Sequence, residues 1–304
     1  MKKVILVLTA IALLVGFSVV LKTMYDGRNQ PSTHPTVVTS FYPLYYFANE
    51  IGKDRITLKN LTPAGSEPHD YEPTTDDLVT LQTAAIVVIN GAGMEPWIEK
   101  VTADLTKNNV RLLVASEGLT QTVEEDGYSV ADPHVWLDPV LAQEIVKKIT
   151  KELTTLSPGD RAYFEENAKK LNEELQNLHT EYEKTLATCK KRDIFTSHDA
   201  FGYLARRYNM NQVALTGFSP EEEPSAQKLA ETVKIAKEKR ALYIFFETLV
   251  SPRLANTIAK ELGARTLIFD PIEGVTEANA QKGQNYVTIQ KQNLLNLKLA
   301  LSCM

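Results

Sequence analysis

Short apolar runs alternate with amphipathic stretches along most of this chain. Predicted strands of the first half cover residues 36–40, 56–61, 84–90 and 111–115, with helices at 75–82, 96–106 and from 139 onward. Predicted strands of the second half cover 193–197, 212–216, 241–246 and 266–269, with helices at 200–208, 225–239, 252–262 and 287–303. This alternation predicts an α/β fold in which each half has a mainly parallel sheet flanked by helices.

The clearest helical period lies between the two halves. Its apolar positions, spaced by three and four residues, are Phe164, Ala168, Leu171, Leu175, Leu178, Tyr182 and Leu186. A helix over residues 160–189 would be about 45 Å long, which favours one backbone helix that joins both lobes. A short coiled coil is the alternative. The expected organisation is an N-lobe at 36–157, a linking helix at 158–190 and a C-lobe at 191–304.

Residues 1–35 are predicted to be a signal or anchor followed by a tether. Lys2 and Lys3 precede an uncharged apolar run at residues 4–21. The small-x-small site at Ala10 to Ala12 lies inside that run, and no cysteine follows it closely. We therefore expect an uncleaved membrane anchor with an extracytoplasmic body, in preference to a cleaved signal or a lipid-modified cysteine.

The net charge of the chain after its first 30 residues limits the kinds of partner it can bind. The formal net charge is −5, and because the first 30 residues carry +3, the remainder carries −8. An acidic body argues against nucleic-acid binding and suits a protein that attracts cations.

Three histidines and one aspartate each follow a predicted strand, in four different parts of the chain: His69, His134, His198 and Asp270. Ligands of open α/β sheets bind at the carboxyl ends of strands, so these side chains are predicted to meet. Three imidazoles and one carboxylate fill the tetrahedral shell that Zn²⁺ prefers. The two other histidines, His34 and His179, are assigned no metal role.

Six segments carry a resemblance to a known family. They are residues 39–44 (TSFYPL), 68–73 (PHDYEP), 132–139 (DPHVWLDP), 197–204 (SHDAFGYL), 223–225 (EPS) and 269–271 (FDP). With them the chain resembles, over residues 36–304, the metal-specific solute-binding proteins of bacterial zinc and manganese ABC transporters. The resemblance implies two lobes joined by a long helix, with the metal held between them.

The resemblance also places the metal ligands on His69, His134, His198 and Asp270, and implies a membrane ABC permease as partner. His198 looks like the zinc-type arrangement, because manganese-selective members tend to have a carboxylate there. The segment 117–131 lacks the histidine-rich loop of many zinc members. Glu247 and Asp199 are candidates for orienting the imidazoles.

We therefore expect a monomeric, extracytoplasmic protein that captures Zn²⁺ and is not an enzyme. Four protein ligands leave no position for a water nucleophile. The alternatives are a manganese-binding counterpart, a zinc metallohydrolase and a surface adhesin.

Cys189 and Cys303 are the only two cysteines; Cys189 ends the predicted linking helix just before the first C-lobe strand, and Cys303 ends the last predicted helix. An even count outside the cytosol suggests a disulfide. Two separate thiols are the alternative.

Overall fold

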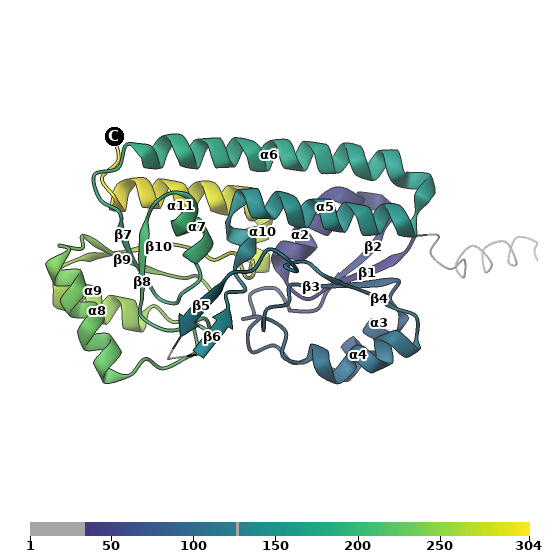
Figure 1. The fold of residues 1–304 in the computed structure, drawn as a ribbon, viewed down its shortest axis with the longest axis horizontal. Helices are drawn as coiled ribbons and strands as arrows, with labels where there is room; N and C mark the ends of the chain where they lie inside the picture. The colour runs from purple at the N-terminus through teal and green to yellow at the C-terminus, as the bar shows by residue number, and fades with distance from the viewer. Residues whose placement is uncertain (1–33, 126–127) are drawn as a thin grey trace, which may run out of the picture.

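The computed structural model describes residues 34–125 and 128–304, which form two lobes side by side beneath one long helix (Figure 1). The α/β fold with two lobes and a joining helix is therefore confirmed. The predicted anchor lies outside the described residues. Within those two ranges, no helix is long and apolar enough to span a bilayer.

The first lobe contains a four-stranded parallel sheet with the strand order β2-β1-β3-β4. Its strands are β1 (Thr36–Thr39), β2 (Thr57–Asn60), β3 (Ile86–Ile89) and β4 (Arg111–Val114). Thr36 pairs with Thr57 at one edge, and Ile86 pairs with Arg111 at the other. All four residues of β3 are buried because this strand has a hydrophobic core on each of its faces.

Helices cover both faces of this sheet (Figure 1). They are α2 (Tyr42–Gly52) and α5 (Pro139–Leu156) on one face, and α3 (Thr75–Thr83) and α4 (Ile98–Lys107) on the other. Single 3₁₀ turns lie at η1 (Lys53–Arg55), η2 (Val135–Leu137) and η3 (Pro158–Asp160). Helix α2 was not among the predicted helices, although it buries Leu44, Phe47 and Ile51.

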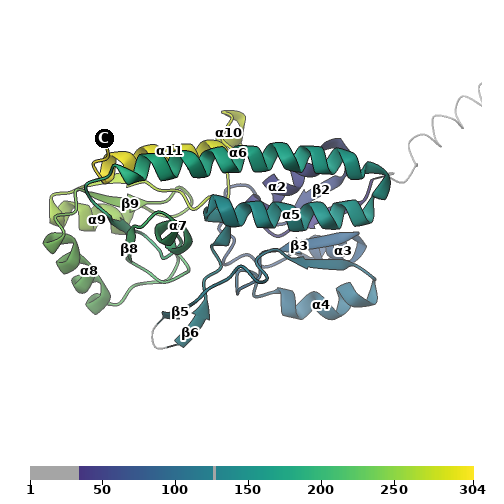
Figure 2. The ribbon, with the colours of Figure 1, turned by 45° about the horizontal axis from the view of Figure 1, so that its top comes forward.

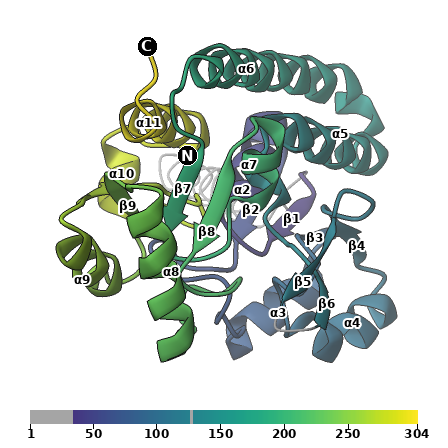
Figure 3. The ribbon, with the colours of Figure 1, turned by 60° about the vertical axis from the view of Figure 1, so that its left-hand side comes forward.

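The second lobe contains two parallel strand pairs, and β7 lies beside β9. The strands are β7 (Asp193–Thr196), β8 (Asn211–Ala214), β9 (Tyr243–Phe246) and β10 (Arg265–Ile268). Its helices are α7 (Gly202–Arg207), α8 (Ala226–Glu238), α9 (Arg253–Leu262), α10 (Glu277–Gln281) and α11 (Tyr286–Ala300). Viewed from this lobe, α11, α6 and α5 lie on the same side of the molecule (Figure 3).

Helix α6 (Arg161–Ala187) is the predicted linking helix. It packs against α2 and α5 of the first lobe and against α11 of the second (Figure 2). The residues it buries are the predicted stripe: Phe164, Ala168, Leu171, Leu175, Leu178, Tyr182 and Leu186. The apolar face is therefore used within one chain along its whole length, which excludes the coiled-coil alternative for these residues.

The largest difference from the expected layout lies between β4 and His134. No strand was predicted there, whereas the structure has an antiparallel hairpin of β5 (Thr122–Glu125) and β6 (Tyr128–Ala131). Thr122 pairs with Ala131 at the base of the hairpin. His134 therefore follows β6 and is not connected to the end of β4 by a loop alone.

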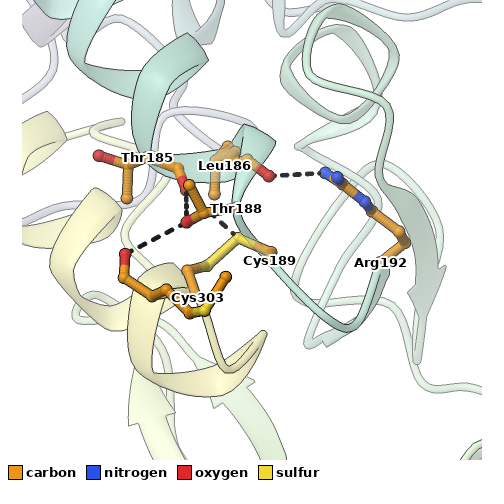
Figure 4. The surroundings of a disulfide bond; sticks show 7 residues. Thr185, Leu186, Thr188, Cys189, Arg192 and Cys303 are labelled. Atoms are coloured by element: carbon orange, nitrogen blue, oxygen red, sulfur yellow. Dashed lines mark hydrogen bonds between the residues drawn. A yellow bond between two sulfur atoms is a disulfide. The ribbon is translucent and has the colours of Figure 1, made fainter.

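A disulfide joins Cys189, just after α6, to Cys303, just after α11 (Figure 4). The two residues also form an isolated antiparallel bridge through their backbones. Nearby, Thr188 Oγ1 donates to the carbonyl of Met304, and Arg192 donates to the carbonyl of Leu186. The C-terminus is thus attached to the end of the linking helix.

Candidate metal centre

Four side chains from four separate segments meet between the lobes. His69 lies in the loop after β2, His134 after β6, His198 after β7 and Glu273 in the loop after β10. One ligand atom from each lies within 4.8 Å of the others. Three of the four predicted ligands are therefore brought together, and the fourth member of the cluster is Glu273 instead of Asp270.

The geometry centres on one carboxylate oxygen. Glu273 Oε1 lies 3.3 Å from Nε2 of His69, 3.5 Å from Nε2 of His134 and 3.4 Å from Nε2 of His198. Donor atoms around a tetrahedral zinc at 2.0–2.2 Å are separated from one another by about 3.3–3.6 Å. The three separations match the edges of such a shell.

Burial and hydrogen bonding are consistent with a cation site. His134 and His198 have no exposed side-chain area, Glu273 has 1% and His69 has 9%. Nε2 of His134, Nε2 of His198 and Oε2 of Glu273 are buried with no hydrogen-bond partner within residues 34–125 and 128–304. Unsatisfied buried polar atoms are costly, so a ligand that uses these lone pairs is expected.

Two carboxylates orient the buried imidazoles. Asp132 Oδ1 lies 3.0 Å from Nδ1 of His134, and Glu247 Oε1 lies 2.6 Å from Nδ1 of His198. A proton held on Nδ1 leaves the lone pair of Nε2 directed at the centre of the cluster. Glu247, at the end of β9, is thus placed as the sequence suggested.

Asp132 was not among the candidates for orienting the imidazoles. Asp199 was, but its backbone N–H donates to Gly217, and its side chain lines a cavity of about 490 Å³ beside α8. Its pKa is raised by burial and by the nearby Asp132. In this structure Asp132, and not Asp199, is the carboxylate that contacts Nδ1 of His134. The sequence signal for Asp132 is its place two residues before His134.

The pKa values of the cluster residues depend on burial and on the charged groups beside them. Burial alone would lower the pKa of His198, but Glu247 and Glu273 outweigh burial and raise that pKa well above its usual range. Burial likewise opposes the charged form of His134, and the adjacent carboxylates of Asp132 and Glu273 raise its pKa. Burial alone would raise the pKa of Glu273, but the imidazoles, above all His198, hold it well below its usual range. The cluster therefore has anionic and cationic groups in contact, and a divalent cation would replace the protons.

Asp270 has a different place from the one predicted. Its Oδ2 accepts from Thr248 Oγ1 at 2.6 Å, and its Oδ1 accepts from the backbone N–H of Ile272 at 2.7 Å. Burial raises the pKa of Asp270 to about 6 against these hydrogen bonds. Ile272 has a φ of +60°, which is rare for a β-branched residue. Asp270 thus holds the turn that brings Glu273 into the cluster.

The chain matches the family model described as zinc-uptake complex component A, periplasmic, over residues 37–300. It is 39% identical over 277 residues to the high-affinity zinc uptake system protein ZnuA of Bacillus subtilis, covering 87% of each chain. It is 36% identical over 310 residues to the zinc-binding lipoprotein AdcA of Streptococcus pneumoniae, covering 98% of this chain but only 61% of that relative's length.

The chain is also similar to solved structures of zinc-binding proteins. The crystal structure of the Zn(II)-bound ZnuA-like domain of Streptococcus pneumoniae AdcA is 37% identical, with a TM-score of 0.77. The match covers 88% of this chain and 99% of that domain. The extent of these matches is sufficient to assign the family: this chain belongs to the ZnuA family of zinc-uptake components.

Proposed function

We propose that this protein captures one Zn²⁺ ion through His69, His134, His198 and Glu273 and delivers it to an ABC permease for import. The observation that carries the proposal is the set of three Nε2 atoms lying 3.3–3.5 Å from one carboxylate oxygen in a buried site. Membership of the ZnuA family supports transport as the role, and the zinc-bound state of the AdcA domain supports the metal.

The cluster is suited to holding a cargo ion. Four protein donors complete a tetrahedral shell, so no position remains for a reactive water. Two donors come from each lobe, so the ion would be held by both lobes. Release then requires the donors of one lobe to move away from those of the other, and we propose that the permease causes that movement.

The family and the names of its relatives support an extracytoplasmic location. We propose that the body functions outside the cytoplasmic membrane. Retention by an uncleaved segment in residues 1–35 remains our prediction for the anchor. Mass spectrometry of the mature protein from membrane fractions would test it: a chain that begins after residue 21 would show that the segment is cleaved.

Zinc binding is tested by competition with a chelating dye and by calorimetry on protein stripped of metal. The protein should bind one Zn²⁺ per chain, and His134→Ala should weaken binding strongly. His179→Ala is the matched control, because His179 lies in α6 with Nδ1 3.0 Å from Tyr208 Oη. Unchanged zinc affinity in His134→Ala would overturn the site.

The choice of metal is tested by equilibrium competition between Zn²⁺ and Mn²⁺. Three imidazoles favour zinc, since Mn²⁺ prefers more oxygen donors. His198→Glu should therefore reduce the preference for Zn²⁺ over Mn²⁺. A preference for Mn²⁺ in the unmodified protein would support the manganese-binding alternative.

A further inference from the structure

The segment from Asp132 to Asp138, which carries His134, is attached at both ends to α7 of the second lobe. At one end, Tyr203 Oη donates to the backbone carbonyl of Asp132 at 2.8 Å. At the other, Arg207 Nε lies 2.8 and 2.7 Å from the two carboxylate oxygens of Asp138, which is 2% exposed. The segment thus belongs to the first lobe by its chain and is held by the second lobe through its contacts.

The carboxylate of Asp132 transmits this attachment to the imidazole. Its Oδ1 accepts from the backbone N–H of His134 and lies 3.0 Å from Nδ1 of the same residue. Its Oδ2 lies 3.6 Å from Nη2 of Arg206, whose guanidinium stacks over the Tyr203 ring at 4.7 Å. One oxygen therefore orients the imidazole while the other contacts α7.

Gly202, at the start of α7, allows this close approach. A Cβ atom at position 202 would lie 2.9 Å from Oδ2 of Asp132 and 3.0 Å from Nη1 of Arg206. Contacts shorter than 3.0 Å are not tolerated by a real Cβ, so any larger residue would displace the carboxylate. The glycine is needed here for space, because it allows Asp132 to pack against the helix.

We propose that Gly202 and Arg206 are positioning residues for the metal, acting through Asp132 to hold His134 at a set distance from His198. His198 lies four residues before Gly202 in the same segment, so α7 connects the two imidazoles without the metal. Their ring centroids are 5.3 Å apart. A pair of nitrogens held in this way favours an ion with short bonds and tetrahedral geometry and disfavours one that needs more and longer bonds.

This inference rests on the proposed zinc site and adds the residues that set its selectivity. The first test is Gly202→Ala, which removes no polar group. Displacement of Asp132 should lower zinc affinity by about 10- to 100-fold, the usual effect of losing a partner of a metal-bound histidine. The visible absorption of bound Co²⁺, which reports tetrahedral geometry, should change in band position or intensity.

The second test compares variants of Arg206. Arg206→Met removes the charge beside Asp132 and should reduce the preference for Zn²⁺ over Mn²⁺, whereas Arg206→Lys should restore much of it. Arg111→Met is the matched control, because Arg111 is also a partly exposed arginine that pairs with a carboxylate, that of Glu152 at 3.0 Å, on an edge strand of the first lobe. It should leave the metal preference unchanged.

The outcomes separate this inference from the proposed function. Native zinc affinity, metal preference and Co²⁺ absorption in both Gly202→Ala and Arg206→Met would overturn the positioning role while the zinc site stands. An equal loss of preference in Arg206→Met and Arg111→Met would also overturn it, because the effect would then be one of general stability. Failure of the unmodified protein to bind zinc, or native affinity in His134→Ala, would instead remove the site itself.

Discussion

Asp270 and Glu273 are three positions apart in one loop, yet the backbone gives them different tasks. Asp270 uses both carboxylate oxygens on Thr248 and the N–H of Ile272. Glu273 directs Oε1 at three imidazoles. The turn at Ile272 separates the acid that supports the loop from the acid that completes the cluster.

Substitution of each acid by its amide separates these tasks. Glu273→Gln removes the only carboxylate of the cluster and should weaken zinc binding by about 10-fold or more. Asp270→Asn keeps an oxygen that can accept from Ile272 and a polar group beside Thr248, so zinc affinity should change much less. Chelator competition on both variants measures the difference. A larger loss in Asp270→Asn than in Glu273→Gln would show that Asp270 is the ligand.

His69 and His198 could be predicted from the sequence because each follows a strand of a parallel sheet, where side chains converge. The same rule selected His134, although in the structure this residue follows β6 of the antiparallel hairpin. Glu273 could not be found by that rule, which selects the first acid after β10. Its approach to the cluster depends on the left-handed backbone of Ile272, and β-branched residues rarely adopt that conformation. A weak signal was present, since Glu273 is the one acid in the run from Pro271 to Val275, where its neighbours are Ile272 and Gly274.

At the scale of elements, long periodic segments were predicted well. Every apolar residue of the predicted stripe in α6 is buried, because a 27-residue helix repeats its period often enough to be recognised. The hairpin of β5 and β6 was missed because its strands, TVEE and YSVA, contain no apolar run. Helix α2 was missed because only two residues separate it from β1, so the buried side chains of the helix follow those of the strand with little interruption.

The start of α3 provides a prediction about stability. Asp77 accepts hydrogen bonds from Tyr71 Oη at 2.7 Å, from Thr74 Oγ1 at 2.6 Å and from Lys59 Nζ at 2.9 Å, and with Thr74 it forms a capping box. Burial alone would raise the pKa of Asp77, but these hydrogen bonds hold it well below its usual range. Asp77→Asn should therefore lower the free energy of unfolding at pH 7 by about 1–3 kcal/mol.

The stabilisation by Asp77 should depend on pH. The pKa of Asp77 is lower in the folded state, so its contribution is fully present above the unfolded pKa of about 3.9 and is lost as pH falls toward the folded pKa. The difference between Asp77→Asn and the unmodified protein, measured by urea unfolding, should therefore shrink below about pH 4. Asp76→Asn, one residue earlier on the exposed face of the helix, is the control. An equal effect of both substitutions would count against the capping network.

At the scale of the whole molecule, the disulfide closes a long loop. Cys189 and Cys303 are 114 positions apart, and a cross-link over about 100 residues stabilises by at most about 4.7 kcal/mol in the chain-entropy model. A Cys189→Ser, Cys303→Ser double variant should melt at a lower temperature and bind zinc with unchanged affinity, because neither cysteine belongs to the cluster. Thiol titration of the denatured, unreduced protein should find no free thiol. Two thiols per chain would contradict the bridge.

Helix α6 sets how far the two lobes can move, because it packs on both of them without a break. A continuous helix resists bending, so zinc loading should change the radius of gyration in solution only slightly. Asn177→Pro tests this link at an exposed position near the middle of α6. Proline removes a helical hydrogen bond and clashes with the preceding turn, at a cost of about 3 kcal/mol. The weakened link should let the lobes separate more easily, so zinc should dissociate faster into excess chelator than from Asn177→Ala. Equal dissociation rates from two folded variants would show that the contacts between the lobes, and not the helix, keep the site closed.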